Sequence, residues 1–198
     1  MLVFDLGNVV VDFDQSLFLR QLAAYFNCSL KEVERHIFNS GLENRYDRGS
    51  ITSQEFFQQA TAMLGTAGSY QRFTDAWNTI FTARPEMDAL LAALKKRYRL
   101  GLLSNTNELH FSSIQRAFPV IGVFDDLFLS YQMGATKPDP AVFKAVIDRT
   151  GVDPSHILFI DDIPAHIDAA KSCGMQGIVY THISHLRLAL TERGVSLS

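Results

Sequence analysis

The sequence has little of what marks several classes of protein. Only two of its 198 residues are cysteines. Cys28 and Cys173 lie far apart without a metal-binding spacing, which fits reduced thiols packed in a cytoplasmic protein. No apolar run is long enough to span a bilayer, and no basic segment with a cleavage site precedes the first run, so we expect a cytoplasmic location and no membrane partner. A net charge of −3 gives no reason to expect nucleic acid as a partner, and the oligomeric state stays open.

What is present is typical of one compact domain, or of one domain with an insertion, with 47% hydrophobic and 20% charged residues. Short apolar runs alternate with helical patterns, which indicates βαβ units and a parallel sheet. We expect strands at Leu2–Asp5, Leu100–Ser104, Leu127–Ser130, Ile157–Asp161 and Gly177–Tyr180. We expect helices at Pro85–Arg97, Glu108–Ala117, Pro140–Thr150 and Ala165–Cys173.

The first two expected strands are separated by roughly ninety residues, far more than one crossover needs. Residues 16–81 have an entirely helical pattern, and Ser29 with Glu32 and Thr52 with Glu55 have the spacing of capping boxes. A helical insertion at this point would cover the carboxyl end of the first strand as a lid. The expected division is a core domain at residues 1–15 and 83–198 and a helical cap at residues 16–82.

The most informative side chain is Asp5, at the end of the first expected strand. An apolar run delivers this carboxylate into a turn at Gly7 and Asn8. In an open α/β sheet, ligands are handled at the carboxyl ends of the strands, so Asp5 is a candidate nucleophile or metal ligand. Gly7, two residues later, has no side chain that could donate a proton.

Two further polar groups follow expected strands. Ser104 and Asn105 end the second one, where a hydroxyl and free backbone amides suit phosphate oxygens. Lys137 precedes an expected helix and could neutralise an anionic intermediate. Each has a simpler interpretation, since Ser104-Asn105 could be only a turn and Lys137 a solvated surface lysine.

A pair of carboxylates, Asp161 and Asp162, ends the fourth expected strand. Adjacent carboxylates repel each other unless a cation or a lysine lies nearby. Together with Asp5 they would form an all-oxygen site suited to Mg²⁺. Either residue could instead cap the next helix, but four such features in order at strand ends are improbable by chance.

Four segments that carry these residues resemble, in order, the motifs of the haloacid dehalogenase superfamily of hydrolases. They are Phe4–Val9, Leu103–Asn105, Lys137–Pro138 and Ile160–Asp162. The resemblance covers nearly the whole chain and implies an α/β fold, a Rossmann-like doubly wound parallel sheet with a type 1 helical cap inserted after the first strand. The segment at Asp5 also resembles a bacterial subgroup that includes an α-D-glucose-1-phosphate phosphatase.

The resemblance implies that Asp5 attacks phosphorus and forms an aspartyl-phosphate. It implies a Mg²⁺ cofactor bound by Asp5, the backbone carbonyl of Gly7 and Asp162, with Asp161 supporting the metal directly or through water.

The resemblance also implies a role for the two remaining motifs. Ser104 and the amide of Asn105 would hold the transferred phosphoryl oxygens. Lys137 would offset the charge that develops on them.

The chain departs from this family at Gly7. Most phosphatases of the superfamily carry a second Asp there, which protonates the leaving alcohol and later deprotonates water. Asn8 cannot replace it, because an amide does not titrate in this range. Asp12, His110 or a metal-bound water are possible substitutes. An anomeric sugar phosphate would suffer least from the missing acid, since its leaving hydroxyl is more acidic than an ordinary alcohol.

Substrate specificity is expected to reside in the cap. The polar run Glu43–Gly49 reads as a connector, in which Arg45 or Arg48 could bind a second group of the substrate, or could equally form ion pairs in solvent. Asn8 is a further candidate for a substrate contact. His166, where the family often has an acidic residue, is expected to be a surface or capping residue.

The leading hypothesis is a Mg²⁺-dependent phosphatase that acts on a small phosphorylated metabolite, such as a sugar phosphate. A 2-haloacid dehalogenase is the second, in which Asp5 would attack carbon without a metal, and Lys137 with the carboxylate pair argues against it. A low-turnover binding or regulatory protein is the third, and only Gly7 favours it.

Overall fold

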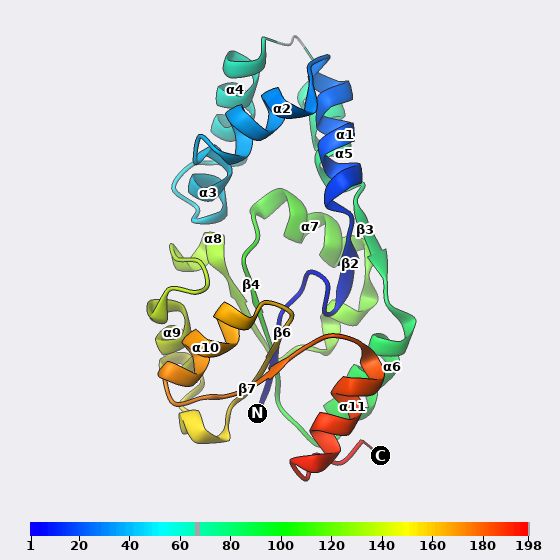
Figure 1. The fold of residues 1–198 in the computed structure, drawn as a ribbon, viewed down its shortest axis with the longest axis vertical. Helices are drawn as coiled ribbons and strands as arrows, with labels where there is room; N and C mark the ends of the chain where they lie inside the picture. The colour runs from blue at the N-terminus through cyan, green and yellow to red at the C-terminus, as the bar shows by residue number, and fades with distance from the viewer. Residues whose placement is uncertain (66–67, 198) are drawn as a thin grey trace.

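The computed structural model describes residues 1–65 and 68–197, which form a part built on a sheet and a helical part above it (Figure 1). Residues 66, 67 and 198, which fall in the expected cap and core segments, lie outside the described residues. The expected fold class is confirmed, because a parallel sheet carries helices on both faces and a helical cap follows its first strand.

Five parallel strands form the main sheet in the order β5-β4-β1-β6-β7. Each strand end lies within one residue of the position expected from the sequence. The strands are β1 at Leu2–Phe4, β4 at Leu100–Ser104, β5 at Asp126–Leu129, β6 at Leu158–Asp161 and β7 at Gln176–Val179. The central strand β1 is apolar throughout because both of its faces are buried, and Phe4 pairs with Leu102 on one side and Ile160 on the other.

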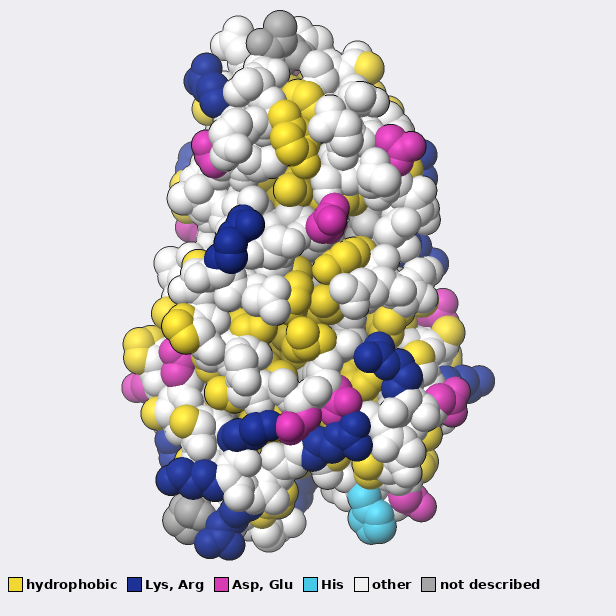
Figure 2. All heavy atoms as spheres, turned by 180° about the vertical axis from the view of Figure 1, so that it is seen from behind, with side chains coloured by type: hydrophobic (Ala, Val, Ile, Leu, Met, Phe, Trp, Pro, Cys, Tyr) yellow, Lys and Arg dark blue, Asp and Glu magenta, His cyan; other side chains and the backbone are white. Residues whose placement is uncertain are grey.

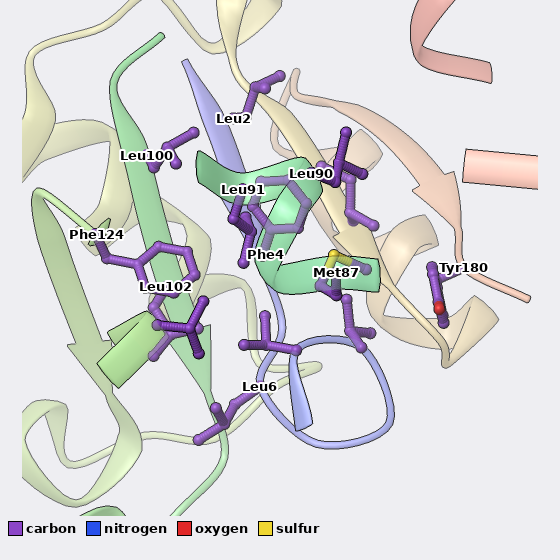
Figure 3. Packing of buried hydrophobic residues seen from close by; sticks show 14 of the residues in the cluster. Leu2, Phe4, Leu6, Met87, Leu90, Leu91, Leu100, Leu102, Phe124 and Tyr180 are labelled. Carbon is purple, nitrogen blue, oxygen red and sulfur yellow. The ribbon is translucent and has the colours of Figure 1, made fainter. Parts of the chain in front are cut away.

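Alternate residues of β1 belong to two hydrophobic layers, one on each face of the sheet. Leu2 and Phe4 pack with Leu90, Leu91 and other side chains of α6, α7 and α11, as Figure 3 shows for Phe4 and its neighbours. Val3 packs instead with side chains of α9 and α10. These helices are α6 at Pro85–Lys95, α7 at Glu108–Ala117, α9 at Pro140–Thr150, α10 at Pro164–Ser172 and α11 at Ile183–Glu192, and short turns lie at α8 (Ser130–Met133), η2 (Pro119–Val123) and η3 (Pro154–His156).

The cap is a bundle of short helices with a hydrophobic cluster of its own. Its aromatic centre contains Phe18, Phe56, Phe73 and Trp77, all buried. The helices are α1 at Gln15–Phe26, α2 at Leu30–Val33, the π-helical turn η1 at Glu34–Phe38, α3 at Leu42–Asp47, α4 at Ser53–Leu64 and α5 at Tyr70–Asn78. In the described part of the chain, no helix combines the length and the apolar character that crossing a membrane requires.

Both capping boxes expected in the cap are confirmed. Ser29 and Glu32 cap α2, and Thr52 and Glu55 cap α4, each through reciprocal side-chain and backbone hydrogen bonds.

One element of the cap junction differs from the expectation of an entirely helical segment. The last cap helix ends at Asn78, and β3 at Phe81–Ala83 pairs antiparallel with β2 at Val11–Phe13. This ribbon joins cap to core, and an ion pair between Arg84 and Asp12 ties its two strands together. Three-residue strands are too short for a recognisable alternation of apolar and polar residues, which is why the sequence did not reveal them.

The cap touches the core again through α3 and the start of α4. Ser53 donates a hydrogen bond to Glu108 of α7, and the backbone amide of Leu109 donates to the Tyr46 hydroxyl, 3.1 Å away. Gly49, after α3, lies so close to α8 that an added Cβ would sit 2.0 Å from the backbone oxygen of Tyr131. On the face opposite to the view of Figure 1, hydrophobic side chains gather at the level where the cap meets the core (Figure 2).

We predict that Gly49→Ala destabilises the protein more than Gly41→Ala. Both glycines have a positive φ, 64° and 78°, which a side chain adopts at a cost of about 1 kcal/mol. Only Gly49 also faces the backbone of Tyr131, and such overpacking adds about 1–3 kcal/mol. Urea denaturation of the two variants measures the difference, and equal losses would show that α3 does not press against α8.

Candidate active site

Three adjacent strands end at the same edge of the sheet with polar side chains. Asp5 follows β1, Ser104 ends β4 and Asp161 ends β6, and Asp162 comes directly after it. Lys137 joins them from the loop between α8 and α9. Asp5, Ser104, Lys137 and Asp161 are all buried, although such polar groups normally prefer water. The structure therefore brings together the groups that the sequence placed at separate strand ends.

The Lys137 ammonium lies at the centre of this group. Its Nζ donates hydrogen bonds to Asp5 Oδ1 at 2.7 Å, to Asp161 Oδ2 at 2.6 Å and to the backbone carbonyl of Leu103 at 3.1 Å. All three of its N–H donors are used. The side chain is 1% exposed, so its interpretation as a solvated surface lysine is wrong.

The charges in this group shift one another's pKa. Burial alone would lower the pKa of Lys137, but the adjacent carboxylates of Asp5 and Asp161 raise it above its ordinary value. Burial raises the pKa of Asp5 to about 6, and the ammonium of Lys137 opposes that rise. For Asp161, burial is outweighed by the hydrogen bond from His166 and the charge of Lys137, and the pKa lies below its ordinary range. The ammonium of Lys137 thus favours the ionised form of Asp5 in a site where burial disfavours it.

His166 is placed differently from what the sequence suggested. It is buried, with Nδ1 lying 3.0 Å from both carboxylate oxygens of Asp161. Asp161 also accepts a hydrogen bond from the amide of Ile163 at 2.8 Å. His166 lies in the first turn of α10, which begins soon after β6 and brings the ring close to the end of that strand. The short separation of His166 from Asp161 in the sequence was the signal that could have predicted this contact. His166 and Asp161 together hold Lys137 in place.

The Asn105 side chain holds the backbone of Lys137. Its Nδ2 donates to the Lys137 carbonyl at 2.9 Å, and its Oδ1 accepts from the Lys137 amide at 2.7 Å. The next residue, Thr106, is held by Ser130, whose hydroxyl accepts from its amide and donates to its carbonyl. The segment after β4 is therefore more than a surface turn, because it positions the lysine.

The carboxylates of Asp5, Asp161 and Asp162 have the composition of a magnesium site. One oxygen of each lies within 4.8 Å of the others, and hard oxygen donors are the ligands that Mg²⁺ prefers. Asp161 already accepts several hydrogen bonds, which leaves Asp5 and Asp162 as the better candidates for direct ligands. The side chain of Asn8 bonds to Asp162 and helps to orient it. Gly7 lies in the same turn as Asn8, two residues after Asp5.

A cavity of about 200 Å³ lies between this edge of the sheet and the cap. It is small beside typical ligand pockets of roughly 300–1,000 Å³. Its lining includes Gly7, Ser104 and Asn107 from the core and Phe18, Glu43 and Asp47 from the cap. A Cβ added to Gly7 would meet nothing within 4 Å, so the place of the missing side chain is open.

Neither side chain considered as a substitute for the missing acid at Gly7 is well placed for that role. Asp12 is paired with Arg84 in the ribbon and does not line the cavity. His110 lines it, but burial lowers the pKa of His110 to about 3, and the ring stacks on Trp77 with its Nε2 3.0 Å from the Trp77 carbonyl. A neutral imidazole at pH 7 has no imidazolium proton to give.

The segment expected to be a connector is largely the helix α3, and it presents carboxylates to the cavity. Neither Arg45 nor Arg48 lines the cavity. Arg45 is exposed and donates a hydrogen bond to Gln59 at 2.6 Å. Glu43 and Asp47 do line the cavity. The sequence signal that could have identified these two carboxylates is their spacing of four residues, which places both on one face of a helix. That signal could be used only if a helix was expected in this segment.

The family follows from comparison with known proteins. A model of haloacid dehalogenase-like hydrolases matches residues 1–174 of the chain. The chain belongs to this family. Two relatives of this haloacid dehalogenase-like hydrolase are phosphatases by name. D-ribitol-5-phosphate phosphatase of Bacteroides thetaiotaomicron is 30% identical over 188 residues, 88% of each protein, and phosphatase MT3486 of Mycobacterium tuberculosis is 34% identical over 189 residues, 88% of this chain and 83% of the relative.

A solved structure of similar fold contains ligands. The HAD family enzyme bt-2542 of Bacteroides thetaiotaomicron, in complex with magnesium and inorganic phosphate, matches with a TM-score of 0.84 and 30% identity. The match covers 93% of this chain and 97% of that one. A haloacid dehalogenase-like hydrolase of this fold thus accommodates both magnesium and phosphate.

We predict that Lys137→Met lowers the free energy of unfolding by about 3–5 kcal/mol at neutral pH, because it leaves two carboxylates buried without a counter-charge. Without the ammonium, the folded-state pKa of Asp5, which already lies above the unfolded value, rises further, and that of Asp161 rises from below its ordinary range. The loss of stability is therefore complete at pH values above the folded-state pKa of these carboxyls, and it becomes smaller as the pH falls through that pKa.

Urea denaturation of Lys137→Met at pH 8 and pH 5 tests this sign. The exposed Lys144→Met serves as the matched control and is expected to change stability by less than about 0.5 kcal/mol. A loss for Lys137→Met that is equal at both pH values would contradict the unpaired-charge explanation.

Proposed function

We propose that this protein is a Mg²⁺-dependent phosphatase that hydrolyses a small phosphorylated metabolite through an aspartyl-phosphate. The observation that carries the proposal is the Asp5 carboxylate, at the end of the central strand, with Lys137 Nζ 2.7 Å away and the carboxylates of Asp161 and Asp162 beside it. A nucleophile, a cation and an oxygen-rich metal site in one place suit the transfer of a phosphoryl dianion.

Each group has a role in this reaction. Asp5 attacks phosphorus, Ser104 and the amide of Asn105 hold the phosphoryl oxygens, and Lys137 offsets the charge that builds on them. Asp5, the Gly7 carbonyl and Asp162 would hold Mg²⁺, with Asp161 behind them. The bound ion supplies positive charge that reduces repulsion between the attacking carboxylate and the phosphate.

The substrate we propose is a phosphorylated sugar or a related polyol. The small cavity admits little beyond a metabolite of that size. A relative that is 30% identical is named for D-ribitol 5-phosphate, an acyclic polyol phosphate. Asn8, Arg45 and Arg48 remain predicted substrate contacts, although neither arginine lines the cavity in this conformation.

Two other functions use the same site differently. A dehalogenase would require no metal, and the three clustered carboxylates with Lys137 favour phosphate chemistry instead. A low-turnover binding protein is favoured by the open place at Gly7. Turnover measured on phosphorylated metabolites and on 2-haloacids distinguishes all three.

We predict Mg²⁺-dependent phosphate release from a panel of phosphorylated metabolites, with sugar and polyol phosphates among the best substrates. Asp5→Asn should lower the rate at least about 10³-fold, because the amide cannot form the intermediate. The exposed Asp148→Asn is the matched control and should retain full activity. No release above the Asp5→Asn background would reject the phosphatase and leave the binding and dehalogenase functions.

We predict that Asp162→Asn raises the Mg²⁺ concentration for half-maximal activity by about tenfold or more, since it removes one anionic ligand. A titration of activity with Mg²⁺ measures the change. An unaltered Mg²⁺ requirement in the Asp162→Asn enzyme would exclude this residue from the metal site.

A further inference from the structure

Two carboxylates of the cap line the cavity that Gly7 also lines. Glu43 and Asp47 lie four residues apart in α3, on one face of the helix, and both line the cavity together with Gly7 and Ser104. In so small a cavity, one bound molecule contacts both walls. The group next to the transferred phosphoryl would therefore lie between the end of β1 and α3.

The two cap carboxylates have different partners. Asp47 Oδ1 accepts a hydrogen bond from Asn107 Nδ2 at 2.9 Å, and Asn107 Oδ1 in turn accepts from Trp77 Nε1 at 3.2 Å. Asp47 is thus tied to the core. Among the hydrogen bonds of the described residues, none involves the Glu43 carboxyl, which leaves Glu43 as the group able to meet a ligand.

The surroundings separate the pKa values of these two groups. Burial, with the charge of Asp47 adding to it, raises the pKa of Glu43 to about 8. Burial raises the pKa of Asp47 to about 6, against the hydrogen bond from Asn107. Burial and mutual repulsion thus favour a proton on this pair, and the Asn107 hydrogen bond favours Asp47 as the ionised member, which is the pattern of an acid paired with a carboxylate.

The groups that line the cavity do not oppose this assignment. Of the described residues that line the cavity, none is a lysine or an arginine, so no cation holds Glu43 ionised. From α7, His110 is neutral and Glu108 accepts a hydrogen bond from Ser53. The rest of the described lining carries no charge: it is the polar segment Ser104–Asn107 and apolar side chains such as Phe13 from the ribbon.

We propose that Glu43 is the general acid and base of the reaction, reaching from the cap into the place that Gly7 leaves open. The proposal rests on the phosphatase function above. It assigns catalysis, and not only specificity, to the cap, and it requires the cap to be closed over the sheet when the ester bond breaks.

The proton balance of the two steps is as follows. In the first, a carboxylate oxygen of Asp5 bonds to phosphorus, the bond from phosphorus to the ester oxygen breaks, and that oxygen takes the proton of Glu43 and leaves as an alcohol. In the second, the Glu43 carboxylate takes a proton from water, the water oxygen bonds to phosphorus, and the bond to Asp5 breaks. Inorganic phosphate leaves, and Glu43 is protonated again.

The test is Glu43→Gln assayed on two classes of substrate. With alkyl phosphates, whose leaving oxygen needs a proton, kcat should fall about 10²–10⁴-fold. With an activated aryl phosphate such as p-nitrophenyl phosphate, formation of the phosphoenzyme should change little, because that leaving group departs without a proton. A single-turnover burst of nitrophenolate measures this step and also shows that the variant is folded. Glu34→Gln, an exposed glutamate of the cap, is the matched control.

The pH profile supplies a second readout. Glu43 must be protonated in the first step, so kcat/KM for an alkyl phosphate should fall above about pH 8, and Glu43→Gln should lack this limb. Equal losses in the rate of phosphoenzyme formation for both substrate classes, no loss for either, or an unchanged alkaline limb would overturn the proposal. A wild-type enzyme that releases phosphate from no substrate would instead overturn the phosphatase function itself, so the two failures are distinguishable.

Discussion

The buried ammonium of Lys137 between two carboxylates is the interaction on which the rest of this structure depends. It joins the loop before α9 to the ends of β1 and β6, and Asp5 lies 132 residues away in sequence. Buried charges persist only when they are paired and hydrogen-bonded, so these three groups require one another. His166 and Asn105 hold the other sides of Asp161 and Lys137. The Asp5 carboxylate, the proposed nucleophile, is held in place by this network.

The cap adds a second constraint, because it closes the space above the network. Its aromatic cluster is independent of the sheet, yet Trp77, Asp47 and Ser53 each bond to residues at the start of α7. The same contacts that dock the cap form one wall of the cavity. A molecule bound in this cavity would therefore contact the docked cap, and a group on α3 is placed at the cavity by the same contacts.

Much of the fold and part of the site could be predicted because the signals were local. The apolar runs marked each strand of the main sheet, and the pairs at Ser29 and Thr52 marked two helix starts. Asp5, Ser104 and Asp161 were recognisable because they end such runs. The ribbon formed by β2 and β3 was missed, since each strand has three residues and its partner lies far along the chain. No local sequence pattern indicates a pairing between segments so far apart.

The sequence by itself determined the order of elements, the family motifs and the candidate nucleophile, because apolar periodicity and turn residues act over a few positions. Only the tertiary structure decided that Lys137 is buried, that His166 supports Asp161, and that Glu43 lines the same cavity as Gly7. Burial and charge pairing depend on neighbours that are distant in the chain. The surroundings of these residues therefore depend on packing and do not follow from their positions in a motif.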